Sequence, residues 1–320
     1  ENSEAHEAYL KGRAEQASYS AEGYQKAINY FEQAIEEDPN YALAYAVLAI
    51  AHHRLSTPLG VVPYREVATT VEEMAMKALE IDNSLGEAHA ALGDVKRHYY
   101  WDWTGAEEEY KLAIALDPSS YQAHYGYAFL LSAMARHDEA LAEVRTSQQL
   151  DPLNPETRTA TAFHLRMARR SDEAIEQCRM ALDMNPDYQL AHQRLANNYE
   201  DKGLYKEAAE ARQNQWLLTG ASEEEVAGLS DAAAMGAEDY SRWMLNYARE
   251  RAQRGEYVST FTFAMLHAQL GEKDQAFEWL EESYQERNAG LVILKVTPYF
   301  DPLRDDPRFT DLLRRMNLEP

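Results

Sequence analysis

The chain has 320 residues, which suggests about two domains or one elongated array rather than a single compact core. Its 54 acidic residues outnumber its 31 basic residues, and the net charge of −23 argues against a surface that binds nucleic acid or an anionic membrane. No apolar run reaches the roughly 18 residues that a membrane-spanning helix needs, and the single cysteine, Cys178, excludes an intrachain disulfide.

A segment repeats along the chain. Pro118, Pro152 and Pro186 follow one another at a spacing of 34 residues, and each comes directly after Asp or Asn. Pro39 and Asn83 occupy the same place upstream, where an interval of 44 residues gives the second repeat about ten extra residues. Proline stops a helix, so these positions predict helix ends at a regular interval.

Matching side chains precede each of these positions and predict one buried helix face. Small residues stand five and twelve positions before it, and a mostly larger residue stands eight positions before it. One helix pair cannot bury such a face alone, so consecutive pairs are expected to stack. The predicted face consists of Ala34, Ala78, Ala113, Ser147 and Ala181, of Phe31, Ala75, Tyr110, Val144 and Cys178, and of Ala27, Val71, Ala106, Ala140 and Ala174.

Taken in chain order, the first copy covers about residues 4–40 and carries three extra residues in its turn around 19–23. A sixth copy runs over 189–220, where Ala208 keeps the small position while Arg212 and Gln215 degrade the stripe. Residues 223–255 are predicted to form a diverged helical pair.

The C-terminal part changes character. A late copy covers about 257–287, and a short apolar run follows at 290–296. Asp306 as N-cap and Pro307 at the first position then open an amphipathic helix that is expected to cap the last repeat. Its apolar side chains are Phe309, Leu312, Leu313 and Met316.

The pattern resembles the tetratricopeptide repeat (TPR). The resemblance implies an all-α fold, a right-handed α-solenoid of helix–turn–helix repeats with a C-terminal capping helix. We expect about six repeats over 1–220, including an extended second repeat at 42–85. A diverged helical pair at 221–256 and a final TPR-like repeat plus cap at 257–320 are expected to follow.

Three segments give a closer resemblance. Residues 99–106 (YYWDWTGA), 270–280 (LGEKDQAFEWL) and 300–309 (FDPLRDDPRF) are similar to bacterial TPR regions. Such regions occur alone or attached to winged-helix transcription regulators, nucleotide cyclases or protein kinases. None of those effector modules is recognised in this chain, so their activities are not carried over to it.

The residues that could carry chemistry favour a structural interpretation. His89, His124 and His192 fall at equivalent repeat positions and are expected to pack, and the adjacent His52 and His53 point to different helix faces. No zinc-protease, phosphate-loop or nucleophile-elbow motif occurs. We therefore expect no catalytic residue, no metal, no cofactor and no enzyme activity, with Cys178 a buried apolar residue.

The remaining candidate surface is the concave groove, which the resemblance assigns to the first helix of each pair. Its inward positions combine aromatic side chains with hydrogen-bonding ones, a composition typical of peptide-binding hot spots. The alternative is that the aromatic rings fill the inner curve of the solenoid. Gln193 replaces the Lys that a C-terminal carboxylate clamp would use, which argues against that type of groove. The candidate partner-binding residues are Asp94, Arg97, Tyr125, Phe129, Phe163, Arg166, Gln193 and Asn197.

Three functions stay open. The first is a scaffold that binds a protein or peptide in the groove. The second is a structural protein that assembles head-to-tail into oligomers or filaments, more strongly with added salt or divalent cation because the chain is so acidic. The third is a ligand-sensing module of a bacterial regulator or kinase. The candidate self-association end comprises Leu291, Ile293, Val296, Phe309 and Leu313.

The start at Glu1 leaves two compartments open. A fragment of a regulator would be cytoplasmic, whereas a processed mature chain would be exported.

Overall fold

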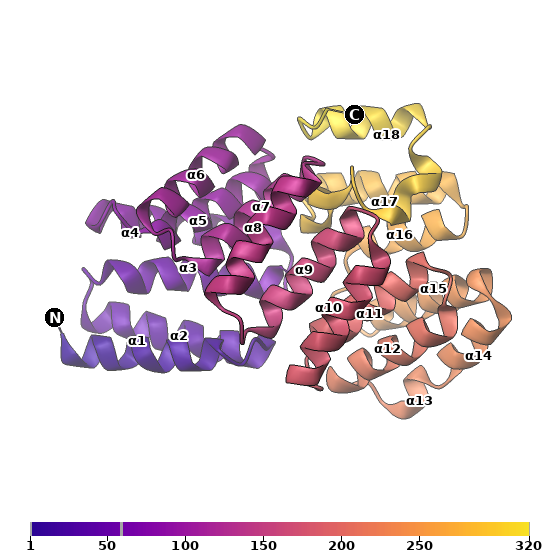
Figure 1. Ribbon diagram of the computed structural model, residues 1–320, viewed down its shortest axis with the longest axis horizontal. Helices are drawn as coiled ribbons and strands as arrows, with labels where there is room; N and C mark the ends of the chain where they lie inside the picture. The colour runs from indigo at the N-terminus through magenta and orange to yellow at the C-terminus, as the bar shows by residue number, and fades with distance from the viewer. Residues whose placement is uncertain (1, 58–59, 320) are drawn as a thin grey trace. The chain divides into compact units, whose positions relative to one another are not determined.

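The computed structural model describes residues 2–57 and 60–319, and helices make up all the regular structure of these residues (Figure 1). None of the described helices combines the length and the apolar character needed to cross a bilayer. The helices are α1 (Ser3–Gln16), α2 (Ala21–Glu37), α3 (Ala42–Ser56), α4 (Tyr64–Ile81), α5 (Gly86–Val95), η1 (Lys96–Tyr100), α6 (Trp103–Leu116), α7 (Tyr121–Ala133), α8 (His137–Leu150), α9 (Pro155–Met167), α10 (Ser171–Met184), α11 (Gln189–Asp201), α12 (Tyr205–Leu218), α13 (Glu223–Val226), α14 (Gly228–Met235), α15 (Ala237–Gln253), α16 (Thr260–Gln269), α17 (Lys273–Gln285), η2 (Ala289–Ile293), η3 (Pro298–Leu303) and α18 (Pro307–Arg315).

The chain divides into two compact units. The first unit contains Glu1–Leu130 and Ser283–Val292, and the second contains Leu131–Glu282 and Ile293–Pro320. The chain therefore leaves the first unit within α7, returns to it for ten residues after Glu282, and ends in the second unit. The units group residues by contact rather than by repeat, so the three-part division at 220 and 256 stays a prediction.

The repeated small-residue face is the interior of both units. Every residue of the predicted face has 0% exposure, from Ala27 in α2 to Ala181 in α10. Alanine allows two helix backbones to approach closely, while Phe31 and Tyr110 fill the wider gaps. Burial also raises the pKa of the Cys178 thiol to about 12, which agrees with its interpretation as an apolar packing residue.

The Asp or Asn before three of the predicted proline stops ends the helix by a local hydrogen bond. At Asp38, Asp117 and Asn185 the backbone is extended, and the side-chain oxygen accepts a hydrogen bond from the backbone N–H two residues later. This Asx turn offers the backbone an alternative to another helical turn. The proline between the two residues then makes continuation impossible.

The segment 99–106 forms a sharp corner between two helices of the first unit. The last turn of the α5 region is π-helical, and Trp101 then adopts a left-handed conformation with φ 52°. Asp102 caps α6 by accepting a hydrogen bond from the Gly105 backbone N–H at 3.0 Å. A Cβ on Gly105 would lie 2.1 Å from an Asp102 carboxylate oxygen, so with any larger residue there the carboxylate would have to shift from its present position. Arg287 covers the Trp101 ring at 4.0 Å.

The predicted diverged pair is built from α13, α14 and α15. A glycine at φ 126°, Gly236, joins α14 to α15. The packing here uses aromatic rings, because Trp216 of α12 lies 4.5 Å from Tyr247 and 5.9 Å from Trp243, both in α15. Rings replace the small-residue face, which explains why the repeat pattern is weak in this region.

The C-terminal helix caps the second unit as predicted. Asp306 caps α18 by accepting a hydrogen bond from the Arg308 backbone N–H at 3.0 Å, and Pro307 is its first residue. Its apolar side chains are buried. Two ion pairs, Arg308 with Asp274 at 2.9 Å and Arg315 with Glu281 at 2.7 Å, join α18 to α17, and Figure 1 shows the two helices side by side.

Candidate interaction site

The predicted groove residues lie on the first helices of successive pairs, and they divide between the two units. Asp94 and Arg97 of α5 and η1, with Tyr125 and Phe129 of α7, belong to the first unit. The second unit holds the other four, on α9 and α11: Phe163, Arg166, Gln193 and Asn197.

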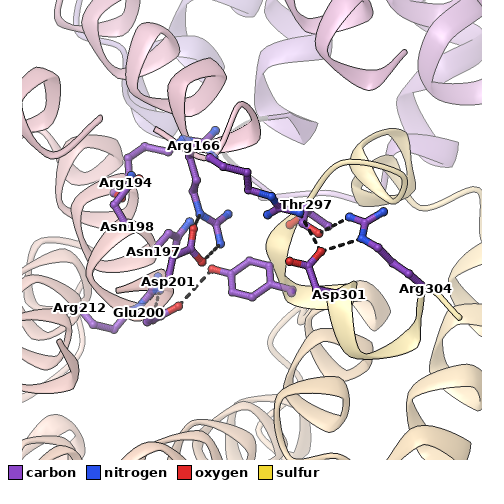
Figure 2. Close-up of polar contacts among 12 residues, drawn as sticks. Arg166, Arg194, Asn197, Asn198, Glu200, Asp201, Arg212, Thr297, Asp301 and Arg304 are labelled. Atoms are coloured by element: carbon purple, nitrogen blue, oxygen red, sulfur yellow. Dashed lines mark hydrogen bonds and ion pairs between the residues drawn. The ribbon is translucent and has the colours of Figure 1, made fainter. Parts of the chain in front are cut away.

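In the second unit, Arg166 and Asp201 form a buried bidentate ion pair (Figure 2). The guanidinium Nε and Nη2 donate to the two carboxylate oxygens at 2.7 and 2.8 Å. Arg166 is 1% exposed, so the charge is almost fully removed from water. A planar fork of this kind fixes the guanidinium face as well as its position.

Glu200, one residue before Asp201, accepts hydrogen bonds from three other elements. Arg212 of α12 donates to its Oε1 at 2.6 Å, Tyr240 of α15 donates to the same oxygen at 2.8 Å, and Tyr299 of η3 donates to Oε2 at 3.1 Å. Arg212 also donates to Asn197 at 2.6 Å. Figure 2 shows Asn197, Glu200 and Arg212 close together at the end of α11.

The segment around Tyr299, which is distant along the chain, contacts this polar site. Its ring lies under the Arg166 guanidinium at 4.3 Å, and its hydroxyl binds Glu200. Two residues later, Asp301 accepts a hydrogen bond from Arg169 at 2.7 Å. The inner face of α9 and α11 is therefore occupied by residues 299–301 of the same chain, and the Tyr299 side chain is buried there.

Two other predicted residues of this unit differ in environment. Phe163 is buried, and the Arg194 guanidinium lies 4.6 Å from its ring. Gln193 is half-buried and forms no hydrogen bond with any part of the chain that the structure describes. Gln193 is thus the predicted residue with free polar atoms at this site.

In the first unit, the predicted aromatic pair is covered by arginines. The rings of Tyr125 and Phe129 lie 4.9 Å apart. Arg54 covers Tyr125 at 4.5 Å, and Arg97 lies 5.6 Å from the Phe129 ring. A guanidinium over an aromatic face is a favourable contact when both are desolvated.

Asp94 anchors this arrangement. Arg97 and the Tyr110 hydroxyl each donate to its Oδ1 at 2.6 Å, and His53 lies 3.5 Å from its Oδ2. Burial alone would raise the pKa of the Asp94 carboxyl, but the His53 and Arg97 charges hold it well below the usual range. Burial lowers the pKa of His53 to about 4.

His53, Asp94 and His98 bring three possible metal ligands within 4.8 Å of one another, a grouping that sequence reasoning missed. Two imidazoles and a carboxylate are the ligand set of many divalent-metal sites. Here, however, the Arg97 guanidinium already neutralises the single carboxylate at 2.6 Å. A dication would meet a fixed positive charge at that distance, so the arrangement fits a buried ion pair better than a metal site.

The three repeat-equivalent histidines do not gather at one site. His89 contacts Glu109 at 2.7 Å, whereas His124 and His192 contact the backbone carbonyls of Pro118 and Pro186. The last two contacts repeat one arrangement: an imidazole bonded to the carbonyl of the proline that precedes its helix. These bonds support the predicted structural role of the three side chains.

The candidate self-association end lies inside the fold. Leu291, Val296, Phe309 and Leu313 are buried, and Ile293 is half-buried. The run at 290–296 forms 3₁₀ helix and turn and packs inward, because an apolar run beside a capping helix gains more by burial than by exposure. Self-association through these side chains would require the segment to leave its place.

Sequence reasoning missed Asp201, Arg212, Tyr240 and Tyr299. Arg212 carried a usable signal, because a buried arginine on a packing stripe requires a carboxylate on a neighbouring helix. Arg212, predicted as a degraded stripe position, is 7% exposed and bonded to Glu200, so the polar side chain on the stripe has a buried partner. Tyr299 carried no such signal, because η3 has no repeat register.

Comparison with known protein families identifies one of the repeats. A tetratricopeptide-repeat family model matches residues 22–41, which cover most of α2 and the Asx turn after it. This match identifies residues 22–41 as a tetratricopeptide repeat, and with the buried small-residue face and the repeated helix pairs it gives the chain the fold of a TPR α-solenoid.

Among curated proteins, the chain is similar to the transcriptional regulator HilA of Salmonella paratyphi A, Salmonella typhimurium and Salmonella typhi. Each is 26% identical over 136 residues, which are 42% of this chain and 24% of the relative. The aligned part thus spans about a quarter of the length of these relatives.

Solved structures with a similar fold include pilF of Pseudomonas aeruginosa, with 17% identity and a TM-score of 0.46 over 87% of this chain and 98% of that one. TTC0263 of Thermus thermophilus has 20% identity and a TM-score of 0.48 over 60% of this chain and 98% of that one. YrrB, described as a TPR protein with an unusual peptide-binding site, has 20% identity and a TM-score of 0.36 over 53% and 82%.

Proposed function

We propose that this chain is a non-enzymatic interaction module that binds a protein or peptide segment on the inner faces of its first helices. The observation that supports the proposal is the seating of Tyr299 on the second unit. One aromatic side chain from a segment about a hundred residues away is held between the Arg166 guanidinium and the Glu200 carboxylate.

The contacts indicate what a partner segment would present. The Arg166 face takes an aromatic ring, Glu200 takes the hydroxyl of that ring, and Arg169 takes an acidic group two residues later. A partner would therefore carry a tyrosine followed closely by Asp or Glu. In the chain itself the segment around Tyr299 occupies the site, so a partner must compete with a tethered segment whose effective concentration is in the millimolar range.

The experiment supplies the segment in trans. A labelled peptide of residues 297–304 (TPYFDPLR) is titrated with the wild-type chain and with Tyr299→Ala, and fluorescence anisotropy reports binding. Because Tyr299→Ala weakens the tethered competitor, the variant should bind the peptide at least tenfold more tightly than the wild type. Tyr257→Ala, at an exposed tyrosine elsewhere in the second unit, should behave like the wild type.

A second peptide with alanine in place of the tyrosine tests the chemistry of recognition. It should bind neither variant. If Tyr299→Ala keeps its helical circular dichroism and binds neither peptide, or binds both equally, the inner face does not recognise an aromatic segment and the proposal fails.

A second candidate function is suggested by the HilA match. We propose that the module serves a bacterial regulator, where partner or ligand binding on the TPR region would control an effector domain. The genomic sequence before Glu1 tests this candidate: an open reading frame that continues into a winged-helix or catalytic domain supports it, and a start codon or leader sequence there contradicts it.

A further inference from the structure

The second unit contains a cavity of about 390 Å³ that shares one residue, Arg169, with the contacts of the Tyr299 segment described above. Residues from the start of α8, the end of α9, the segment before η3 and the helix α18 line it. The volume is within the range of pockets that hold small organic molecules.

The wall of the cavity is cationic although the chain is strongly acidic. Arg169, Lys295 and Arg304 contribute three positive charges, and among the described residues no Asp or Glu lines the cavity. Asp301 neutralises part of this charge from outside, by bonds to Arg169 and Arg304 at 2.7 Å each. The local charge at the cavity therefore stays positive, although the whole chain has a net charge of −23. This local charge favours an anionic ligand, which the acidic remainder of the molecule would repel.

Two polar groups at the cavity are available to a ligand. The Lys295 ammonium makes no hydrogen bond or ion pair with any residue that the structure describes. The Nδ1 atom of His137 is buried and has no hydrogen-bond partner in the same set of residues. Arg304, by contrast, already donates hydrogen bonds to the backbone carbonyls of Lys295 and Thr297 and to the Asp301 carboxylate.

The rest of the lining is apolar. Met167, Phe309 and Leu313 contribute to the walls, and all three side chains are buried. A ligand with only a charged head group, such as inorganic phosphate, would leave these walls without a partner. An apolar body of several carbon atoms would gain affinity by burying its methylene groups against these walls.

We propose that this cavity binds a small carboxylate with an apolar body, the carboxylate meeting Lys295 and His137 and the body lying against Met167, Phe309 and Leu313. Arg169 adds positive charge to the wall while it stays bonded to Asp301. The proposal does not depend on segment recognition at Tyr299, because neither Lys295 nor His137 takes part in those contacts.

Isothermal titration calorimetry with 4-phenylbutyrate tests the proposal on the full chain. The neutral analogue 4-phenyl-1-butanol has the same body and no charge, and inorganic phosphate has charge and no body. We expect 4-phenylbutyrate to bind one site, with the alcohol and phosphate at least tenfold weaker, because each lacks one of the two contacts.

Variants locate the site. Lys295→Met should weaken 4-phenylbutyrate at least tenfold and leave the alcohol unchanged, since it removes charge and keeps an apolar stem. Arg170→Met is the matched control: Arg170 follows Arg169 but pairs with Glu173 and does not line the cavity, so affinity should not change. The proposal is overturned if 4-phenylbutyrate does not bind, if phosphate binds as tightly, or if Lys295→Met and Arg170→Met have equal effects.

Discussion

At the scale of single residues, the charge of Glu200 is paired with a buried cation. Arg212 supplies that cation, and both side chains are less than 10% exposed. Arg212→Met keeps much of the volume but leaves a buried carboxylate whose remaining hydrogen-bond donors, among the described residues, are the hydroxyls of Tyr240 and Tyr299. We expect a loss of about 3–5 kcal/mol in the free energy of unfolding, measured by urea denaturation.

The matched control is Arg242→Met. Arg242 also pairs with a glutamate, Glu238, but the two side chains are 49% and 76% exposed. Solvent screens such a pair, so the change should stay within about 0.5 kcal/mol. Equal effects at the two arginines would show that the Glu200 network does not depend on its charge balance.

His53 makes the first unit sensitive to acid. Burial and the neighbouring Arg54 and Arg97 charges lower its pKa to about 4, although Asp94 opposes them. Between pH 6.5 and pH 4 the unfolded chain therefore binds a proton at His53 that the folded chain does not. The free energy of unfolding should fall by about 3 kcal/mol as the pH drops through this window.

Chemical denaturation at several pH values checks this prediction. Burial also lowers the pKa of His98, so His53→Phe should reduce the slope of stability against pH rather than remove it. His192→Phe, at a half-buried histidine outside this cluster, should keep the wild-type slope. An unchanged slope in His53→Phe would show that His53 is not the group that titrates in this window.

The difference between what could and could not be predicted is visible at residue scale. The buried face from Ala27 to Ala181 could be predicted because its residues recur at a regular interval in the sequence. Each helix pair packs against its neighbours in the same way and therefore needs the same small residues. The partnership of Arg212 with Glu200 and Tyr299 does not follow, since it joins three elements at unequal distances along the chain. The groove residues could be assigned to helices from the sequence. The segment around Tyr299, which contacts Arg166 and Glu200, could not be placed in this way.

At the scale of elements, helix boundaries depend on a few local hydrogen bonds. The cap of α6 is the clearest case, because Gly105 leaves room for the Asp102 carboxylate and the corner before it is left-handed at Trp101. Asp102→Ala removes the acceptor and should lower the free energy of unfolding by about 1 kcal/mol.

Asp102→Asn separates the hydrogen bond from the charge. Asparagine retains the accepting oxygen and loses the negative charge, so it should retain most of the stability that alanine loses. Thermal unfolding of both variants gives the comparison. If asparagine is as harmful as alanine, the interaction of charge with the helix dipole, and not the cap itself, is what stabilises α6.

At the scale of the whole molecule, the C-terminal residues decide whether apolar surface is available for association. Phe309 and Leu313, predicted as a self-association end, are instead buried in the second unit, and α18 is held to α17 by Arg308 and Arg315. A net charge of −23 adds repulsion between copies. We therefore expect light scattering behind a sizing column to give the mass of one chain, 36.5 kDa, at every concentration and salt level.

Leu312→Asp supplies the complementary measurement. Leu312 is 3% exposed and does not line the cationic cavity, and a carboxylate there cannot stay buried without a partner, so α18 should leave its place and expose Phe309, Leu313 and the run before η3. The variant should then form larger species, and more of them at high salt, where charge repulsion is screened. If instead the wild type already grows with concentration and Leu312→Asp does not change that growth, then copies associate through a surface other than the C-terminal segment.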